Sequence, residues 1–237
     1  MLKYYIGDSM KTEFMNLLKS LDIELSEQQY DQFQTYYRLL VEWNDKINLT
    51  AITDERDVFV KHFYDSICLV KGIKLSKQTL LDVGSGAGFP SIPLKIAYPD
   101  LKVTIIDALN KRIKFLNLLV RELNLEVELI HGRAEEYQRK HCFDLVTARA
   151  VANLTMLSEL CIPFAKVNGN FIAMKGPRLS DELKASTKAI ELLGGKVVQD
   201  VHYLVDNQER HLLVVKKVKK SEKKYPRKFS NIKNNPL

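Results

Sequence analysis

The most informative stretch of this chain reads Leu80-Leu81-Asp82-Val83-Gly84-Ser85-Gly86-Ala87-Gly88-Phe89-Pro90. An apolar strand runs here into three alternating glycines, Gly84, Gly86 and Gly88. Glycine has no Cβ, so a turn of this kind lets the backbone approach a ligand closely. A helix that starts near Pro90 would also present its N-terminal N–H groups to that ligand. The stretch therefore predicts a βα turn that holds a nucleotide-like cofactor, and a glycine-rich turn without a ligand is the alternative.

The spacing of the glycines separates two classes of cofactor. This chain has G-x-G-x-G, whereas the dinucleotide fingerprint is G-x-G-x-x-G, with its third glycine placed for helix packing. An acid followed by G-x-G-x-G is typical of proteins that bind S-adenosylmethionine. Asp107 ends the next predicted strand, 19 residues after Gly88, close to the interval of roughly 20 residues expected of an acid that binds a ribose. S-adenosylmethionine is therefore the predicted cofactor, and capping of the following helix by Asp107 is a compatible alternative.

From residue 79 onward, strand-like and helix-like segments alternate. The predicted strands are 79–83, 102–107, 127–131, 143–147 and 170–175, and the predicted helices are 91–97, 110–124, 134–139, 153–166 and 180–193. This alternation predicts a mostly parallel sheet with helices on both faces and a ligand crevice at the carboxyl ends of the strands. Two further strand-like runs, 197–205 and 210–218, predict an antiparallel hairpin that closes the sheet. The expected fold is α/β: a Rossmann-like class I methyltransferase with a seven-stranded sheet.

The first part of the chain reads as helical. Predicted helices cover 10–20, 26–47 and 55–71, and Ser26 is a suitable N-cap for the second of them. The expected organisation is an N-terminal helical extension over 1–75, a methyltransferase domain over 76–218 and a basic C-terminal tail over 219–237.

Charge is distributed unevenly along the chain. Residues 216–237 contain nine basic side chains and one acid, and since the whole chain carries +7, the other 215 residues sum to −1. So dense a block is either a solvated terminus or an arm that binds polyanions.

The other bulk features narrow the class of protein. No signal peptide and no apolar run of roughly 20 residues is present, so we expect a cytoplasmic protein without a membrane span. Cys68, Cys142 and Cys161 lie in apolar surroundings and read as reduced core thiols, with no metal site.

Two loops after later strands carry polar groups to the predicted crevice. Gly132-Arg133-Ala134-Glu135-Glu136 follows the third strand, where the adenine of an adenosyl group would lie, although an ordinary surface loop is the alternative. Ala148-Arg149-Ala150 follows the fourth strand and brings a guanidinium group to the crevice mouth, where it could hold a carboxylate or phosphate. An ion pair between Arg149 and Asp144 is the competing explanation.

The absence of two motifs narrows the chemistry. The chain has neither the Asn/Asp-Pro-Pro-aromatic tetrad of exocyclic-amine methylases nor a nucleophilic Cys after the fourth strand. Guanine N7 carries an in-plane lone pair and no proton, so its methylation needs alignment and charge stabilisation but no general base. Arg149 or Lys175 could orient the base by donating to its O6, as a hypothesis for the catalytic residues.

Further motifs lie along the whole chain. They are Trp43-Asn44, Asn48-Leu49-Thr50-Ala51, His62-Phe63-Tyr64-Asp65-Ser66, Asp82 to Pro90 with Ile92-Pro93-Leu94, Lys111-Arg112 with Phe115-Leu116, Gly132 to Glu135, Ala148-Arg149-Ala150-Val151, Ala173-Met174-Lys175-Gly176 and Tyr225-Pro226-Arg227-Lys228. With these motifs the chain resembles the bacterial small-subunit rRNA guanine-N7 methyltransferases, also called glucose-inhibited division protein B. It departs from that pattern at Ser91, Ser230 and Ile232, where the family usually has Gly, Gly and Pro.

The resemblance implies a substrate and a set of binding residues. The implied reaction is methyl transfer from S-adenosylmethionine to N7 of a guanine in the 530 loop of 16S rRNA. The expected partner is 16S rRNA or the small ribosomal subunit, and the expected protein is a monomer. It implies that the cofactor is bound by Gly84, Phe89, Ala134, Glu135 and Arg149, to which the residue patterns above add Gly86, Gly88 and Asp107. The tail would then be an RNA arm that uses Lys219, Lys220, Lys223, Lys224, Tyr225, Arg227 and Lys228, with Tyr225 or Phe229 stacked on an unpaired base.

Several alternatives stay open at this point. A protein or small molecule could be the methyl acceptor, or the chain could be a non-catalytic rRNA-binding module, while a nicotinamide dehydrogenase fits the glycine spacing and the terminal hairpin least well. His62 and Asp65 are either a buried hydrogen-bonded pair or part of an RNA pocket.

Overall fold

The computed structural model describes residues 2–149 and 152–237, so Met1, Ala150 and Val151 lie outside the described residues. Its centre is a seven-stranded sheet in the order β3-β2-β1-β4-β5-β7-β6. The strands are β1 (Thr79–Val83), β2 (Lys102–Asp107), β3 (Val127–His131), β4 (Phe143–Arg149), β5 (Ala165–Lys175), β6 (Gly195–Val205) and β7 (Gln208–Lys217). The first five strands pair in parallel, and β7 pairs antiparallel to β5 and to β6. The predicted Rossmann-like sheet with its terminal hairpin is confirmed.

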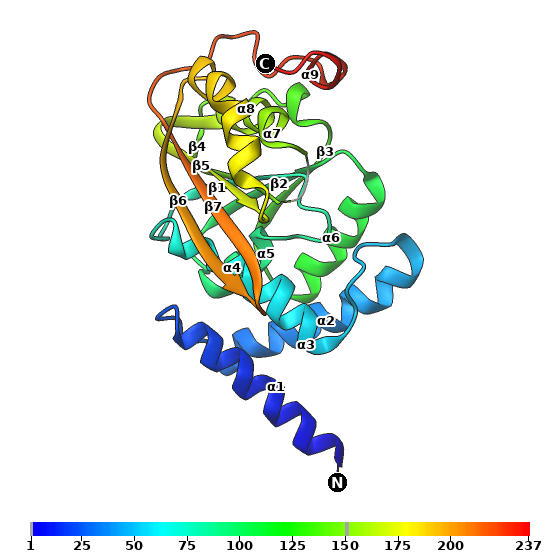
Figure 1. The fold of residues 1–237 in the computed structure, drawn as a ribbon. Helices are drawn as coiled ribbons and strands as arrows, with labels where there is room; N and C mark the ends of the chain where they lie inside the picture. The colour runs from blue at the N-terminus through cyan, green and yellow to red at the C-terminus, as the bar shows by residue number, and fades with distance from the viewer. Residues whose placement is uncertain (1, 150–151) are drawn as a thin grey trace.

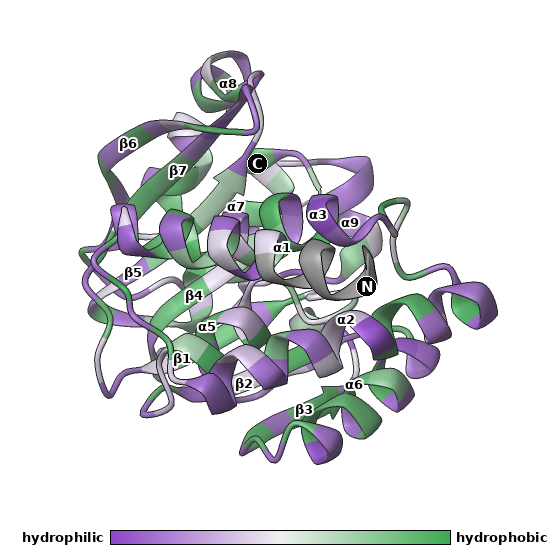
Figure 2. Ribbon diagram, turned by 90° about the horizontal axis from the view of Figure 1, so that it is seen from below, coloured by the Kyte–Doolittle hydropathy of each residue, from purple (hydrophilic) through white to green (hydrophobic). Residues whose placement is uncertain are grey.

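Helices cover both faces of this sheet, as Figure 1 shows. They are α1 (Leu2–Lys19), α2 (Glu27–Ile47), α3 (Glu55–Val58), α4 (Asp65–Ile67), α5 (Ser91–Ala97), α6 (Asn110–Glu122), α7 (Leu154–Cys161), α8 (Leu179–Leu192) and α9 (Phe229–Asn234). One hydrophobic cluster joins α2, α5 and α6 to the sheet, and a second joins α7, α8 and α9 to it. In the ribbon coloured by hydropathy, α2 carries alternate polar and apolar bands, as expected of a helix with one buried face (Figure 2).

Local sequence explains where α2 begins. The Ser26 side chain accepts a hydrogen bond from the Gln29 N–H, and the Gln29 side chain accepts one from the Ser26 N–H, which is a capping box. The buried face of the helix includes Tyr30, Phe33 and Tyr36. Phe33 and Tyr36 contact Phe63 at 5.1 and 4.9 Å between ring centroids, so the N-terminal helices share one core with the sheet. The domain boundary at residue 75 stays a prediction.

Three predicted helices differ in form. The segment 55–71 is broken into α3, a π-helical stretch (Phe59–Tyr64), α4 and a 3₁₀ turn (Cys68–Lys71). The predicted helix at 134–139 is a single 3₁₀ turn (Ala134–Glu136). The predicted helix at 153–166 stops earlier, because β5 already begins at Ala165.

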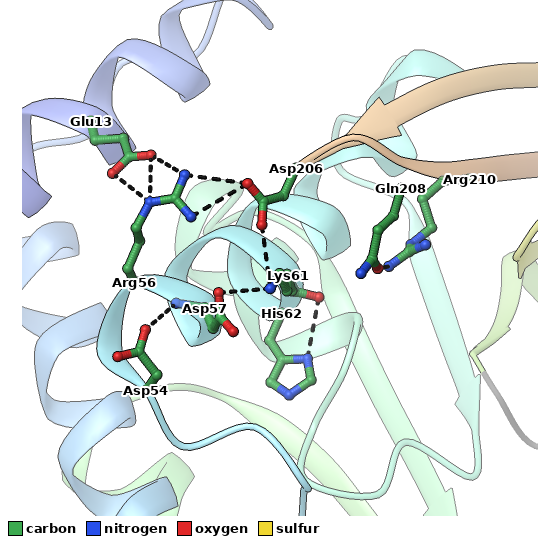
Figure 3. A network of polar contacts seen from close by, with 9 residues as sticks. All are labelled: Glu13, Asp54, Arg56, Asp57, Lys61, His62, Asp206, Gln208 and Arg210. Carbon is green, nitrogen blue, oxygen red and sulfur yellow. Dashed lines mark hydrogen bonds and ion pairs between the residues drawn. The ribbon is translucent and has the colours of Figure 1, made fainter.

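The hairpin turn between β6 and β7 contacts the N-terminal helices through charged groups (Figure 3). Asp206 at the turn lies 3.4 Å from Arg56 and 3.3 Å from Lys61. Arg56 also pairs with Glu13 of α1 at 2.8 Å, and Lys61 pairs with Asp57 at 2.8 Å. These ion pairs hold the end of the sheet against the first helices.

Two predictions about bulk features can be compared with the structure. Cys68 and Cys161 are buried, but Cys142 is exposed, so the prediction of three core thiols is wrong for Cys142. Among the described helices, none combines the length and apolar character needed to span a bilayer.

Candidate functional site

The glycine turn between β1 and α5 has two kinds of glycine. All three have positive φ: 75° at Gly84, 62° at Gly86 and 104° at Gly88. A Cβ at Gly86 would meet open space, whereas one at Gly88 would lie 2.7 Å from Ile92 and 2.8 Å from the Tyr36 hydroxyl. Gly86 therefore leaves room on one side of the turn, and Gly88 is needed for packing behind it.

The N–H groups at the start of α5 are already bonded within the chain. The Ser91 N–H donates to Asp82 Oδ2 at 3.3 Å, and the Ile92 N–H donates to the Gly88 carbonyl at 2.8 Å. The expectation that this helix start offers these groups to a ligand is therefore wrong. The turn offers close approach at Gly86, where a Cβ would meet open space, although the Gly86 N–H itself donates to Asp107.

A cavity of about 440 Å³ lies over the turn at the carboxyl ends of the strands. It brings together residues from four strand ends, in agreement with the predicted crevice. Of the residues predicted to bind the cofactor, those that line it are Gly84, Gly86, Phe89, Asp107, Ala134, Glu135 and Arg149. Gly88, which was also predicted, packs against Tyr36, Ile92 and Leu116.

Asp107 ties the glycine turn to the next helix. Its carboxylate accepts hydrogen bonds from the Leu109 N–H at 2.9 Å and the Gly86 N–H at 3.2 Å, and it lies 3.4 Å from Arg112. The N-cap of α6 is Leu109, so Asp107 does not cap that helix directly. A carboxylate has about four acceptor positions, which leaves Asp107 able to accept a ribose hydroxyl as well.

Arg149 has a different partner from the one considered. It lies 3.3 Å from Asp65, whereas Asp144 binds Lys166 at 2.8 Å and Thr79 at 2.7 Å. The alternative in which Arg149 forms an ion pair with Asp144 is therefore wrong. The guanidinium group also lies over the Phe89 ring, 4.7 Å from its centroid, which fixes Arg149 in the wall of the cavity.

His62 and Asp65 surround this guanidinium group. His62 stacks on Phe89 at 4.7 Å, and its two ring nitrogens lie 2.7 Å from Thr50 Oγ1 and 3.4 Å from Arg149. Burial and the positive charge of Arg149 lower the pKa of His62 to about 4, so the ring is neutral at pH 7. Asp65 also accepts a hydrogen bond from the Tyr203 hydroxyl at 3.0 Å.

A second cavity of about 590 Å³ adjoins the first, and His62 and Arg149 line both. Lys175 also lines this second cavity, where its ammonium group lies 2.6 Å from Glu182 and 3.2 Å from the Ala152 carbonyl. Three further cationic residues line it, namely Lys61, Arg178 and Arg210. The structure thus brings Arg149 and Lys175 to one space, as the guanine-orienting hypothesis requires.

The tail divides into exposed and anchored residues. Lys219, Lys220, Lys223, Lys224 and Lys228 are exposed. Tyr225 is only 3% exposed, and Arg227 binds buried Glu159 through its backbone and guanidinium N–H groups at 2.7 to 2.9 Å. Tyr225 and Arg227 therefore anchor the tail to the protein, which corrects their predicted role as RNA contacts. Phe229 was considered only for RNA, yet it lines the first cavity.

The first cavity fits S-adenosylmethionine. Its volume lies in the range of small-molecule sites, Gly86 presents bare backbone to it, and the acid expected to bind ribose lines it. Within the described part of the chain, Ser85 of the turn lines this cavity, and its buried Oγ has no hydrogen-bond partner. Unpaired buried polar atoms are uncommon, and this hydroxyl group is therefore available to a polar ligand or water.

The sheet order, the hairpin and the glycine turn over this cavity define a class I methyltransferase that uses S-adenosylmethionine. A family profile described as rRNA small subunit methyltransferase G, or GidB, matches residues 29–213. The chain belongs to this family.

Individual relatives agree with the family assignment. Over 233 residues the chain is 50% identical to the Ribosomal RNA small subunit methyltransferase G of Lactococcus lactis subsp. cremoris (strain MG1363), covering 95% of this chain and 98% of that protein. It is 52% identical over 234 residues to the protein of the same name from Bacillus velezensis, with the same coverage. Among solved structures, a methyltransferase from Pyrococcus furiosus shares the fold, with a TM-score of 0.57 and 14% identity over 77% of this chain and 97% of that chain. The predicted family, enzyme class and cofactor are confirmed.

Proposed function

We propose that this chain transfers the methyl group of S-adenosylmethionine to N7 of a guanine in the 530 loop of 16S rRNA. The observation that carries the proposal is the junction of the two cavities at His62 and Arg149. A methyl donor in the first cavity and a base in the second would meet at that junction. The relatives named above supply the class of substrate, since they are ribosomal RNA methyltransferases of the small subunit.

The groups around the junction suit N7 chemistry. When bound, S-adenosylmethionine supplies the methyl group, and its sulfur keeps the electron pair of the broken C–S bond. The N7 lone pair forms the new bond to carbon, so no proton has to leave the base. The pKa of His62, lowered to about 4, makes its ring a weak base, and Asp65 is engaged by Arg149 and Tyr203. Alignment, rather than proton removal, is therefore the task of these residues.

Lys175 is the proposed donor to guanine O6. Glu182 and the Ala152 carbonyl hold its ammonium group in the second cavity, at 2.6 and 3.2 Å. A single ammonium group can donate to O6 and leave the N7 lone pair free, whereas a bidentate contact to both atoms would block the reaction. Arg149 is held by Asp65 at the junction and is proposed to contact both the cofactor and the base.

The exposed tail lysines are the proposed contacts to RNA phosphates. Lys219, Lys220, Lys223, Lys224 and Lys228 form this set. We further propose that the protein acts in the cytoplasm as a monomer, on free 16S rRNA or on the small ribosomal subunit.

An RNA with one atom changed tests the proposed acceptor. In 7-deazaguanosine a carbon replaces N7, so the base keeps its pairing edge but has no lone pair at that position. Ribosomal RNA transcribed with 7-deazaguanosine should accept no labelled methyl from S-adenosylmethionine, while RNA transcribed with 7-deazaadenosine, the matched control, should be methylated as usual. Methylation of the 7-deazaguanosine RNA would contradict the proposal, and label recovered in protein or in a small molecule would favour the other acceptors.

A further inference from the structure

The C-terminal segment around Phe229 is fixed to the protein on both sides. Before it, Arg227 binds Glu159, which is fully buried, and the Lys140 ammonium group donates to the Tyr225 carbonyl at 2.7 Å. After it, Ile232 in α9 is fully buried in the cluster that includes α7. The position of Phe229 is therefore set by several contacts that use no RNA.

Phe229 itself lies at the first cavity. It is half-buried and lines that cavity together with Ala134 and Glu135. Its N–H donates to Glu135 Oε1 at 3.2 Å, and the Arg133 guanidinium group lies over its ring at 5.5 Å. An aromatic face is thus placed beside the segment that follows β3.

The order of the strands fixes which end of the cavity this is. Neighbouring strands run β3, β2, β1, β4, so the strand-end residues follow in the order Ala134, Asp107, Gly84 and Arg149 along the crevice. The reacting methyl group has to face the second cavity, which joins the first at Arg149. The other end of the cofactor, its adenine, then falls at Ala134 and Phe229.

We propose that Phe229 is a cofactor-binding residue that packs against the adenine of S-adenosylmethionine, so that the C-terminal segment is part of the cofactor site as well as a carrier of lysines. This inference rests on the cofactor of the proposed function. Contact between an aromatic ring and a base is typically strong enough for its loss to be measured as a weaker Kd. Deletion of the tail would then weaken cofactor binding as well as RNA binding, contrary to the expectation for a simple RNA arm.

Calorimetry on the full chain without RNA tests the proposal. Phe229→Ala should weaken the Kd for S-adenosylmethionine by roughly 5- to 30-fold. The same factor should appear with methylthioadenosine, which has the adenosine part but lacks the amino acid part. Lys233→Ala, an exposed residue of the same helix α9, is the matched control and should bind S-adenosylmethionine like the wild type. Phe229→Leu keeps apolar packing in the tail, so a loss of affinity in this variant separates a lost ring contact from an unfolded segment.

The outcomes distinguish this inference from the function on which it rests. A wild-type chain that binds S-adenosylmethionine, with Phe229→Ala and Phe229→Leu within twofold of it, overturns the inference alone. Weaker binding of S-adenosylmethionine with unchanged binding of methylthioadenosine also overturns the inference. The Phe229 ring would then contact the amino acid part of the cofactor and not its adenine. A wild-type chain that binds neither compound overturns both the inference and the proposed function.

Discussion

Gly86 and Gly88 stand two residues apart in one turn, yet their surroundings give them different roles. A side chain at Gly86 would enter the cavity, while one at Gly88 would meet Ile92 and Tyr36 at less than 3 Å. Tyr36 in turn donates to the Ala87 carbonyl at 2.6 Å and stacks on Phe89 at 5.5 Å. Packing of α2 therefore holds the cofactor turn from behind.

Alanine at each of these two glycines should separate folding from binding. Gly88→Ala should lower the free energy of unfolding by about 2–4 kcal/mol, because it combines a positive φ with overpacking. Gly86→Ala should cost less stability, since its Cβ meets open space, but should weaken S-adenosylmethionine binding. Urea unfolding and calorimetry on both variants check this, and equal stability of the two variants would contradict the assignment.

Asp82 beneath the turn links stability to pH. It is fully buried, and burial raises the pKa of its carboxyl group from 3.8 to about 7. Between these two pH values the folded chain binds more protons at this site than the unfolded chain, so stability falls as pH rises through the interval.

Replacement of this acid by its amide should flatten that pH dependence. From pH 4.5 to pH 7.5, Asp82→Asn should lose less stability than the wild type, by about 1–3 kcal/mol. Urea unfolding at both pH values measures the difference. Identical slopes for the two proteins would show that Asp82 does not titrate in this range.

At the scale of elements, the tail depends on one buried ion pair. The Arg227 guanidinium group lies 2.7 Å from the carboxylate of Glu159 in α7. The Glu159 side chain is fully buried. Loss of one partner of such a pair leaves a buried charge without compensation. The local order of the tail should therefore depend on this arginine far more than on the neighbouring lysines.

Arg227→Met should destabilise the docked tail by about 2–3 kcal/mol. Trypsin should then cleave the tail of this variant faster than that of Lys228→Met, the exposed control, and Arg227→Met combined with Glu159→Leu should recover part of the protection. Equal cleavage of the two single variants would refute the anchoring role.

Features that depend on neighbouring residues were predictable from the sequence, whereas contacts between residues far apart in the chain were not. The strand–glycine turn and the acid at Asp107 follow from patterns within about 30 residues. The pairing of Arg149 with Asp65 joins residues 84 positions apart, and no local spacing specifies it. The position of Phe229 in the cofactor cavity likewise depends on how the tail folds back over α7. The charge of the tail predicted only a solvated terminus or an arm that binds polyanions.

For the whole molecule, the exposed tail lysines and the cofactor cavity are expected to bind different ligands. These lysines lie along the tail and do not line the cavity over the strand ends. Neutralisation of RNA phosphates releases counterions, so RNA affinity should fall with salt in proportion to the number of contacts. Cofactor affinity should depend little on these lysines.

Replacement of the exposed lysines by glutamine tests this separation without removal of Phe229. The set is Lys219, Lys220, Lys223, Lys224 and Lys228. The slope of log affinity for ribosomal RNA against log salt should become shallower by about 2–4, while the Kd for S-adenosylmethionine stays within twofold of the wild type. An unchanged salt slope would show that the tail does not contact phosphates.

Mass mapping of 16S rRNA tests the central claim most directly. Ribosomal RNA from cells that lack this protein is compared with RNA from cells that carry it, after cleavage into fragments. The account predicts that one N7-methylguanosine in the 530 loop is absent without the protein and returns when purified protein and S-adenosylmethionine are added to the RNA or to small subunits. An identical set of methylated nucleosides in both samples, or loss of a methyl group from another base, would contradict it.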